Sequence, residues 1–339
     1  MKTVVIFQGG GALGALGAFG AGAWQTLAKD EDILDGPLVA VAGASIGAVN
    51  AAAVAYNAGA EGGALAIEAL WRDHLTTAPF PFFGMLPLPV VGTHGGAENW
   101  NGFVTGLLLG NRSLYAPRWP VWQPLSGLKR LQQPLHDRSS MWRLLEEHFP
   151  VYRSVGSEAP LLAAAAVDVL AGELQLFDSD SAPFTARHLA AASAIPLLFD
   201  PVEIHGRLYW DGEMIRDSML PALLERLLEV RRIKRGEPVQ LVTIETMARD
   251  FPAAPQSGVE IAYRALNLLQ VGKFEPPQVD GVNLARFRRI VRRSLAEDGV
   301  SGHFDYSPTR IEQLIDQGRD AARRTVEWSR TKRQAEAAH

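Results

Sequence analysis

A serine lies between two glycines in the segment 43–47, Gly-Ala-Ser-Ile-Gly. An apolar run over 38–42 precedes it and predicts a buried strand, and an alanine-rich stretch to about residue 57 predicts a helix. The pattern G-x-S-x-G at a strand-to-helix junction is typical of a sharp turn that lifts a nucleophilic serine out of the sheet. The free N–H groups at the start of the helix favour negative charge there. Ser45 is therefore the candidate nucleophile, in a turn formed with Gly43, Ile46 and Gly47.

A glycine-rich loop follows the apolar run at 4–7, which predicts the first strand. Ester hydrolysis builds negative charge on a carbonyl oxygen, and N–H groups of a glycine-rich loop can approach that oxygen closely. The candidate oxyanion hole consists of Gly9, Gly10, Gly11, Ala12 and Gly14. The same loop also satisfies G-x-G-x-x-G, so a dinucleotide-binding oxidoreductase is the alternative. That alternative needs an acid at the end of the second strand, where this sequence has Ala42-Gly43.

An acidic residue ends a predicted hairpin strand in the segment Trp210-Asp211-Gly212-Glu213. Taken alone, an aspartate before a glycine is typical of a turn. A serine nucleophile needs a base, however, and a triad would need a histidine as well. Each of the eight histidines is expected to be a surface or capping residue. The sequence therefore favours Asp211 as the base of a two-residue serine–aspartate site.

These three motifs, in this order, resemble the patatin-like phospholipase family. That family has a glycine-rich loop after its first strand, then G-x-S-x-G, and later D-G-G or D-G-A. Segments that resemble the family around these motifs are 42–51, 191–196 and 199–202. The resemblance spans about residues 3–225, and the tail, including 305–309, looks like the bacterial branch with an added C-terminal helical region.

The resemblance implies a three-layer α/β/α sandwich and a serine-dependent lipid acyl hydrolase. Ser45 would attack an acyl ester, and Asp211, with Gly212 as its motif glycine, would take the proton and later activate water. No metal and no other cofactor is implied. The resemblance does not separate phospholipase from lipase, esterase or thioesterase activity, and a catalytically silent lipid-binding relative is a further alternative.

Two residues depart from the family pattern. Leu13 stands where many members carry arginine or lysine, and Glu213 stands where the family has glycine or alanine. Like-charge repulsion from Glu213 would raise the pKa of Asp211 if the two side chains approach each other.

The order of elements that must position these residues predicts the fold class. Strand, glycine turn and helix alternate twice over 3–57, which is typical of a mostly parallel α/β sheet covered on both faces. Further strands are expected over 161–170, 174–177, 202–204, 207–210 and 239–245, and a helical pattern begins at about residue 257. We expect an acyl hydrolase domain over 1–250 and a helical C-terminal extension over 251–339.

Proline and aromatic residues dominate residues 78–126, and proline interrupts both helices and sheets. We expect an irregular apolar cap or lid there, with a plain surface loop as the alternative. Arginines crowd residues 286–293, where the apolar spacing predicts a helix with one buried face. Its arginine face is expected to be solvated, with a contact to anionic lipid headgroups as the alternative.

Composition narrows the class of protein. The chain of 339 residues is 47% hydrophobic and 21% charged, which suits a large packed core, and its net charge of −4 gives no electrostatic footprint for nucleic acid. Without cysteine there is no disulfide and no thiolate ligand or nucleophile. No signal peptide or membrane span is expected, which suggests a cytoplasmic protein with peripheral membrane contact as a further option. The expected partner is a lipid or acyl-ester substrate.

Overall fold

The computed structural model describes most of the chain. The described residues are 1–10, 14–30, 33–57, 60–79, 101–102, 105–106, 109–118, 134–155, 158–251, 254–255, 258–295, 298 and 303–337. Gly11, Ala12 and Leu13 lie outside them, as do 80–100 and 119–133, which hold most of the expected cap.

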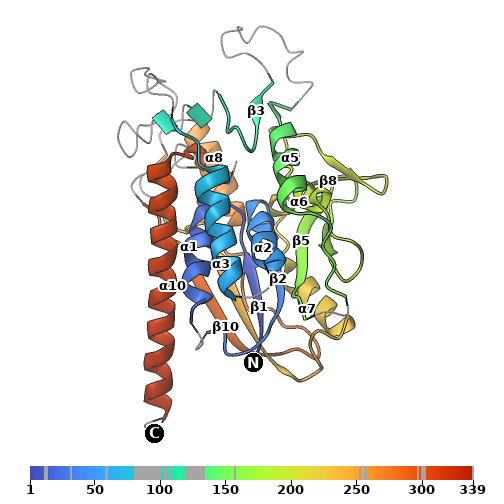
Figure 1. Cartoon of the computed structure of the whole chain (residues 1–339), viewed down its shortest axis with the longest axis vertical. Coiled ribbons are helices and arrows are strands. Elements are labelled where there is room, and N and C mark those ends of the chain that lie inside the picture. Colours follow the sequence, from blue (N-terminus) through green and yellow to red (C-terminus); the bar gives the residue numbers. More distant parts are fainter. Residues whose placement is uncertain are drawn as a thin grey trace.

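A single large sheet organises the fold (Figure 1). Its order is β10-β9-β1-β2-β5-β8-β7, and β6 also pairs with β5. The parallel strands are β1 (Lys2–Phe7), β2 (Leu38–Ala44), β5 (Leu161–Asp168), β9 (Pro238–Glu245) and β10 (Asn283–Val291). The antiparallel strands are β6 (Leu174–Asp178), β7 (Val202–Ile204) and β8 (Arg207–Asp211). A separate two-stranded sheet pairs β3 (Ala116–Pro117) with β4 (His136–Asp137). The mostly parallel sheet predicted from the sequence is confirmed.

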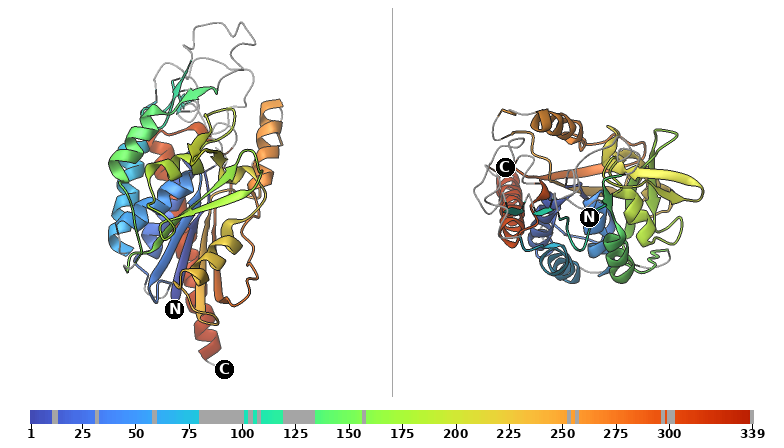
Figure 2. Two further views of the ribbon diagram at one scale, coloured as in Figure 1. Left: turned by 90° about the vertical axis from the view of Figure 1, so that its right-hand side faces the viewer. Right: turned by 90° about the horizontal axis from the view of Figure 1, so that it is seen from above.

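Helices cover both faces of the sheet, as the two turned views in Figure 2 show. Alternate residues of β1 point to opposite faces, so Val5 packs in one apolar core and Val4 in the other. The core with Val5 includes residues of α1 (Ala18–Leu27), α2 (Ile46–Tyr56), α3 (Ala60–Ala69), α5 (Ser139–His148), α6 (Ala186–Ala192) and α10 (Pro308–Ala337). The core with Val4 includes α7 (Met219–Glu229). The three-layer sandwich is therefore confirmed.

The C-terminal region combines helices with one strand. The helical pattern expected after residue 257 is confirmed for α8 (Gly258–Gln270) and α10. The helix α10 lies against α1 so closely that a Cβ at Gly318 would stand 2.1 Å from the carbonyl oxygen of Phe19. Among the described residues, no helix is both long enough and apolar enough to cross a bilayer.

The helix expected over the arginine-rich segment is wrong, because residues 283–291 form β10 and pair in parallel with β9. Apolar side chains of β10 divide between the two faces of the sheet: Phe287 packs against one core and Ile290 belongs to the other. The arginines are stabilised in an extended chain by acids on neighbouring elements, as in the Arg289–Glu245 pair at 2.6 Å. A helix at this position could not have placed apolar side chains in both cores. The domain boundary at residue 250 stays a prediction.

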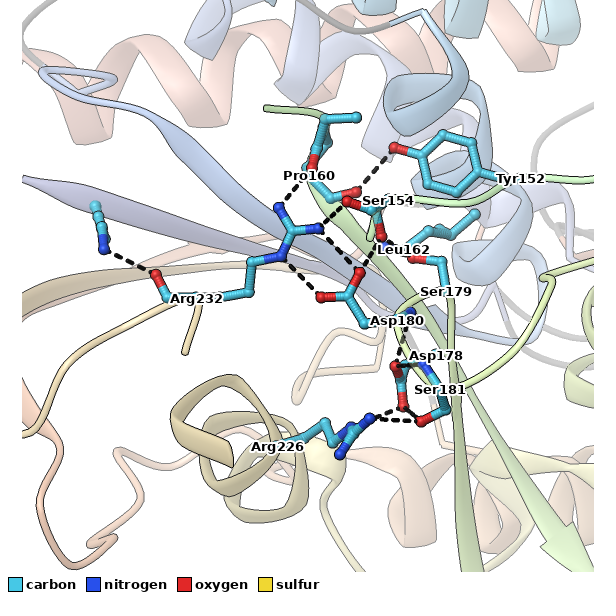
Figure 3. A network of polar contacts seen from close by, with 12 residues as sticks. Tyr152, Ser154, Pro160, Leu162, Asp178, Ser179, Asp180, Ser181, Arg226 and Arg232 are labelled. Carbon is cyan, nitrogen blue, oxygen red and sulfur yellow. Dashed lines mark hydrogen bonds and ion pairs between the residues drawn. The ribbon is translucent and has the colours of Figure 1, made fainter. Parts of the chain in front are cut away.

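A polar network joins α7 and the segment after it to the residues at the end of β6 (Figure 3). Arg232 binds Asp180 at 2.8 Å, and Asp180 also accepts a hydrogen bond of 2.6 Å from the Ser154 hydroxyl. Arg226 binds Asp178 at 3.1 Å on the same side. The network lies beside the first residues of β5, because the Leu162 N–H donates to Ser179. It therefore braces the end of the sheet opposite the serine turn. Its arginines and aspartates are paired with one another.

Candidate active site

Ser45 lies in the turn between β2 and α2 and holds a strained backbone conformation. Its φ of 53° and ψ of −139° fall in a region that residues with a Cβ rarely adopt. The Ser45 N–H donates to the carbonyl oxygen of Ala192 at 2.8 Å, which helps to hold the turn. At Gly47 a Cβ would stand 2.3 Å from the Phe7 carbonyl oxygen, so the helix can start this close to β1 only with glycine there. These contacts therefore hold the backbone of Ser45 in one conformation.

Asp211 ends β8 and lies level with Ser45 across β5. The register pairs Ala44 with Ala165 and Asp211 with Ala166, so the residue after Ala44 reaches the level of Asp211. The Ser45 hydroxyl lies close enough to the Asp211 carboxyl group to lower its pKa. The structure thus brings together the two residues that the sequence motifs singled out.

The Asp211 carboxyl group is buried, with 1% of the residue exposed. Burial raises its pKa to about 7, although the hydrogen bond from the Glu213 N–H and the nearby Ser45 hydroxyl act in the opposite direction. The Glu213 N–H donates to Asp211 Oδ1 at 2.8 Å, and the Asp211 N–H donates to the Ala194 carbonyl oxygen at 2.9 Å. The carboxyl group is therefore held in place by backbone contacts and is poised to change its protonation near neutral pH.

Glu213 connects Asp211 to the glycine-rich loop. Its Oε1 accepts the Gly9 N–H at 3.1 Å, and its Oε2 pairs with Lys273 Nζ at 3.0 Å. Lys273 also donates to the backbone carbonyl oxygen of Glu213 at 2.8 Å. The charge of Glu213 raises the pKa of Asp211, as expected if the side chains approached, and the charge of Lys273 lowers it. The departure from the family motif is therefore accompanied by a buried counter-charge.

Sequence reasoning missed Lys273, which belongs to no motif and lies between α8 and β10. The available signal was indirect: a glutamate in place of glycine or alanine beside a buried aspartate requires a nearby cation.

The glycine-rich loop packs directly against the serine turn. A Cβ at Gly9 would stand 2.7 Å from the Ser45 Cβ, so a side chain there would collide with Ser45. Gly14 adopts a φ of 90° and lies next to Ile46. Of the expected oxyanion-hole residues, the structure describes Gly9, Gly10 and Gly14, and it places Gly9 and Gly14 beside the serine turn.

A small cavity of about 30 Å³ opens beside Ser45. Most of its lining is apolar: Ile46, Leu114, Tyr115, Met141, Ile195 and Phe199. The structure therefore places an apolar environment beside Ser45.

The described histidines are not placed to complete a triad. His303 is buried, and burial lowers its pKa to about 3. Burial also lowers the pKa of His136 to about 4. No hydrogen bond joins any described histidine to Ser45 or Asp211. Within the described part of the chain, no group of three or more histidine, aspartate or glutamate side chains could hold a metal ion.

Comparison with known proteins places these residues in a family context. A sequence model of the family described as "Patatin-like phospholipase" matches residues 5–224. No curated protein matches the sequence. Among solved structures, VipD from Legionella pneumophila is similar at a TM-score of 0.44 and 14% identity, over 96% of this chain and 67% of that one. The type III effector protein ExoU is similar at a TM-score of 0.36 and 14% identity, over 96% of this chain and 53% of that one. The matched segment contains Ser45, Asp211 and Glu213, whereas Lys273 lies beyond it.

Proposed function

Because the chain belongs to the patatin-like phospholipase family, we propose that it hydrolyses lipid acyl esters with Ser45 as nucleophile and Asp211 as general base. One observation carries the assignment of roles: a serine in a strained turn lies level with, and close to, a buried carboxyl group whose pKa is about 7. A general base works best when its pKa lies near the operating pH, because it is then both ionised and sufficiently basic.

In the first half-reaction, Asp211 accepts the hydroxyl proton as Ser45 Oγ attacks the ester carbonyl carbon. The resulting tetrahedral intermediate carries a negative oxygen. It collapses when the bond to the alcohol breaks, and Asp211 returns the proton to the departing alkoxide. The products of this stage are the free alcohol and an acyl group esterified to Ser45.

In the second half-reaction, Asp211 takes a proton from water, and the hydroxide attacks the acyl-enzyme carbonyl carbon. Collapse of the second tetrahedral intermediate expels Ser45 Oγ, which recovers its proton from Asp211. A fatty acid is released and the enzyme returns to its starting state. Both steps use the same carboxyl group, so no histidine, metal or other cofactor is required.

The oxyanion donors belong to the glycine-rich loop in this proposal. The Gly9 N–H already donates to Glu213, so it serves to anchor the loop instead of binding the substrate oxygen. The donors would then come from Gly10, Gly11, Ala12 and Gly14. Removal of one such donor in known hydrolases costs about 3–4 kcal/mol of transition-state stabilisation.

A serine-directed fluorophosphonate probe tests the nucleophile. The wild-type chain should be labelled on Ser45, and Ser45→Ala should abolish both labelling and hydrolysis of a long-chain ester, a loss of about 10⁶-fold for a serine nucleophile. Ser193→Ala is the matched control, because Ser193 lines the same cavity and should leave labelling of Ser45 in place. Undiminished labelling or hydrolysis in Ser45→Ala would refute the assignment.

A further inference from the structure

A large groove lies between β10 and α10. It has a volume of about 850 Å³. Residues 285–289 and 291–293 line one wall, so side chains from both faces of β10 contribute and the groove follows the outer edge of the strand. The other wall is one face of α10, which includes Arg324 and Trp328. Figure 1 shows α10 beside this end of the sheet, and β10 lies three strands from β2, which leads into Ser45.

No described strand pairs with the outer edge of β10. Among the described residues, β10 pairs with β9 on its inner side and with no strand on its outer side. The helix α10 runs along this edge in the opposite direction, because Gln317 contacts Arg293 while Ser329 contacts Arg288. An edge strand with free N–H and C=O groups can accept a further strand from another polypeptide.

The groove is strongly basic. Among the described residues that line it, seven are arginines and one, Asp250, is acidic. Four of the arginines pair with carboxylates elsewhere in the fold: Arg249, Arg286, Arg289 and Arg292. Arg293 and Arg324 are exposed, and no described carboxylate forms an ion pair with either. These two guanidinium groups therefore leave a positive potential in the groove.

We propose that this groove binds an extended, acidic segment of a partner protein, which adds to β10 as a further strand. The backbone of the segment would pair with the free edge, and its carboxylates would face Arg293 and Arg324. The indole of Trp328, which is 65% exposed on the helical wall, offers an apolar surface to an intervening side chain. A concave groove walled by a helix suits one extended chain better than the flat surface of a bilayer.

The proposal can be tested with the full-length chain and a fluorescein-labelled eight-residue peptide in which glutamate and valine alternate. Fluorescence anisotropy should show saturable binding that weakens as salt rises. The double variant Arg293→Gln, Arg324→Gln should weaken binding about tenfold, because it removes the two positive charges with which no described carboxylate pairs. The matched control is Arg323→Gln, Arg330→Gln, which removes the same charge from α10 outside the groove and should leave binding unchanged.

A second peptide separates strand addition from simple charge attraction. Methylation of every second backbone nitrogen removes edge-facing donors while keeping the charges, and it should abolish binding. Binding that survives this methylation, or that the groove variant does not weaken, would overturn the proposal, as would the absence of binding at millimolar peptide. Co-sedimentation with phosphatidylglycerol vesicles that requires Arg293 and Arg324, in the absence of peptide binding, would assign the groove to membranes instead.

Discussion

Replacement of Asp211 by asparagine should abolish hydrolysis and at the same time stabilise the folded protein at neutral pH. The two effects have one cause, which is the burial of a carboxyl group that must ionise to act as a base. Asparagine keeps the size of the side chain and can still accept the Glu213 N–H, which lies 2.8 Å from Oδ1 in the wild type. It cannot take a proton from Ser45, and it carries no charge that burial would destabilise.

The size of the effect follows from the pKa of Asp211, which burial raises from 3.8 to about 7. Between these values the folded protein holds a proton that the unfolded chain has released, so the free energy of unfolding falls as pH rises. Each pH unit in that window is worth about 1.36 kcal/mol. From pH 5 to pH 8 the wild type should therefore lose about 3 kcal/mol relative to Asp211→Asn, which has no such titration.

Urea unfolding of both proteins at pH 5 and at pH 8 measures this difference. Asp180→Asn is the matched control, because Asp180 is also mostly buried but has a lowered pKa: burial raises it, and hydrogen bonds from Arg232 and Ser154 outweigh that effect. Asp180→Asn should destabilise the protein about equally at pH 5 and at pH 8, because both values lie above the range in which Asp180 binds a proton, whether folded or unfolded. If Asp211→Asn changed stability equally at both pH values, the buried, high-pKa carboxyl group would be refuted.

Two further substitutions test how the site is held. Lys273→Met should move the acid limb of the kcat/KM profile to higher pH, because the Lys273 charge lowers the pKa of Asp211; an unmoved limb would contradict this. Gly47→Ala should strongly reduce both soluble yield and fluorophosphonate labelling, since its Cβ would stand 2.3 Å from the Phe7 carbonyl oxygen. Wild-type activity in Gly47→Ala would show that the serine turn tolerates a displacement that the structure does not allow for.

Sequence patterns located the parts of the site that depend on neighbouring residues along the chain. A serine between glycines after an apolar run predicted the turn at Ser45, because the steric demands of such a turn are local. The end of a hairpin strand likewise predicted the position of Asp211. The glycines in these two segments already indicated two features of the site. They suit a turn with a positive φ at Ser45, and they let the backbone of Gly9 lie close to Ser45.

Contacts between distant segments were not predictable in this way. Lys273 reaches Glu213 across 60 residues of sequence, and nothing near Lys273 marks it as a partner of a buried carboxylate. The helix predicted for the arginine-rich segment was wrong for a related reason. Apolar residues at 284, 287, 290 and 291 fit one helix face, and they equally fit a strand with a core on each side. Only the neighbouring strand β9 and its Glu245 decide between the two.

The buried pair of Glu213 and Lys273 makes the C-terminal region part of the site. The family match ends at residue 224 and contains both Ser45 and Asp211, but the cation that offsets Glu213 comes from the loop after α8. A glutamate left without that cation would be an uncompensated buried charge, which is strongly destabilising. It would also leave its repulsion of the Asp211 carboxylate unopposed. A chain cut at residue 250 would therefore lose the electrostatic balance of the base as well as the strand β10, even though it would keep every motif that identifies the family.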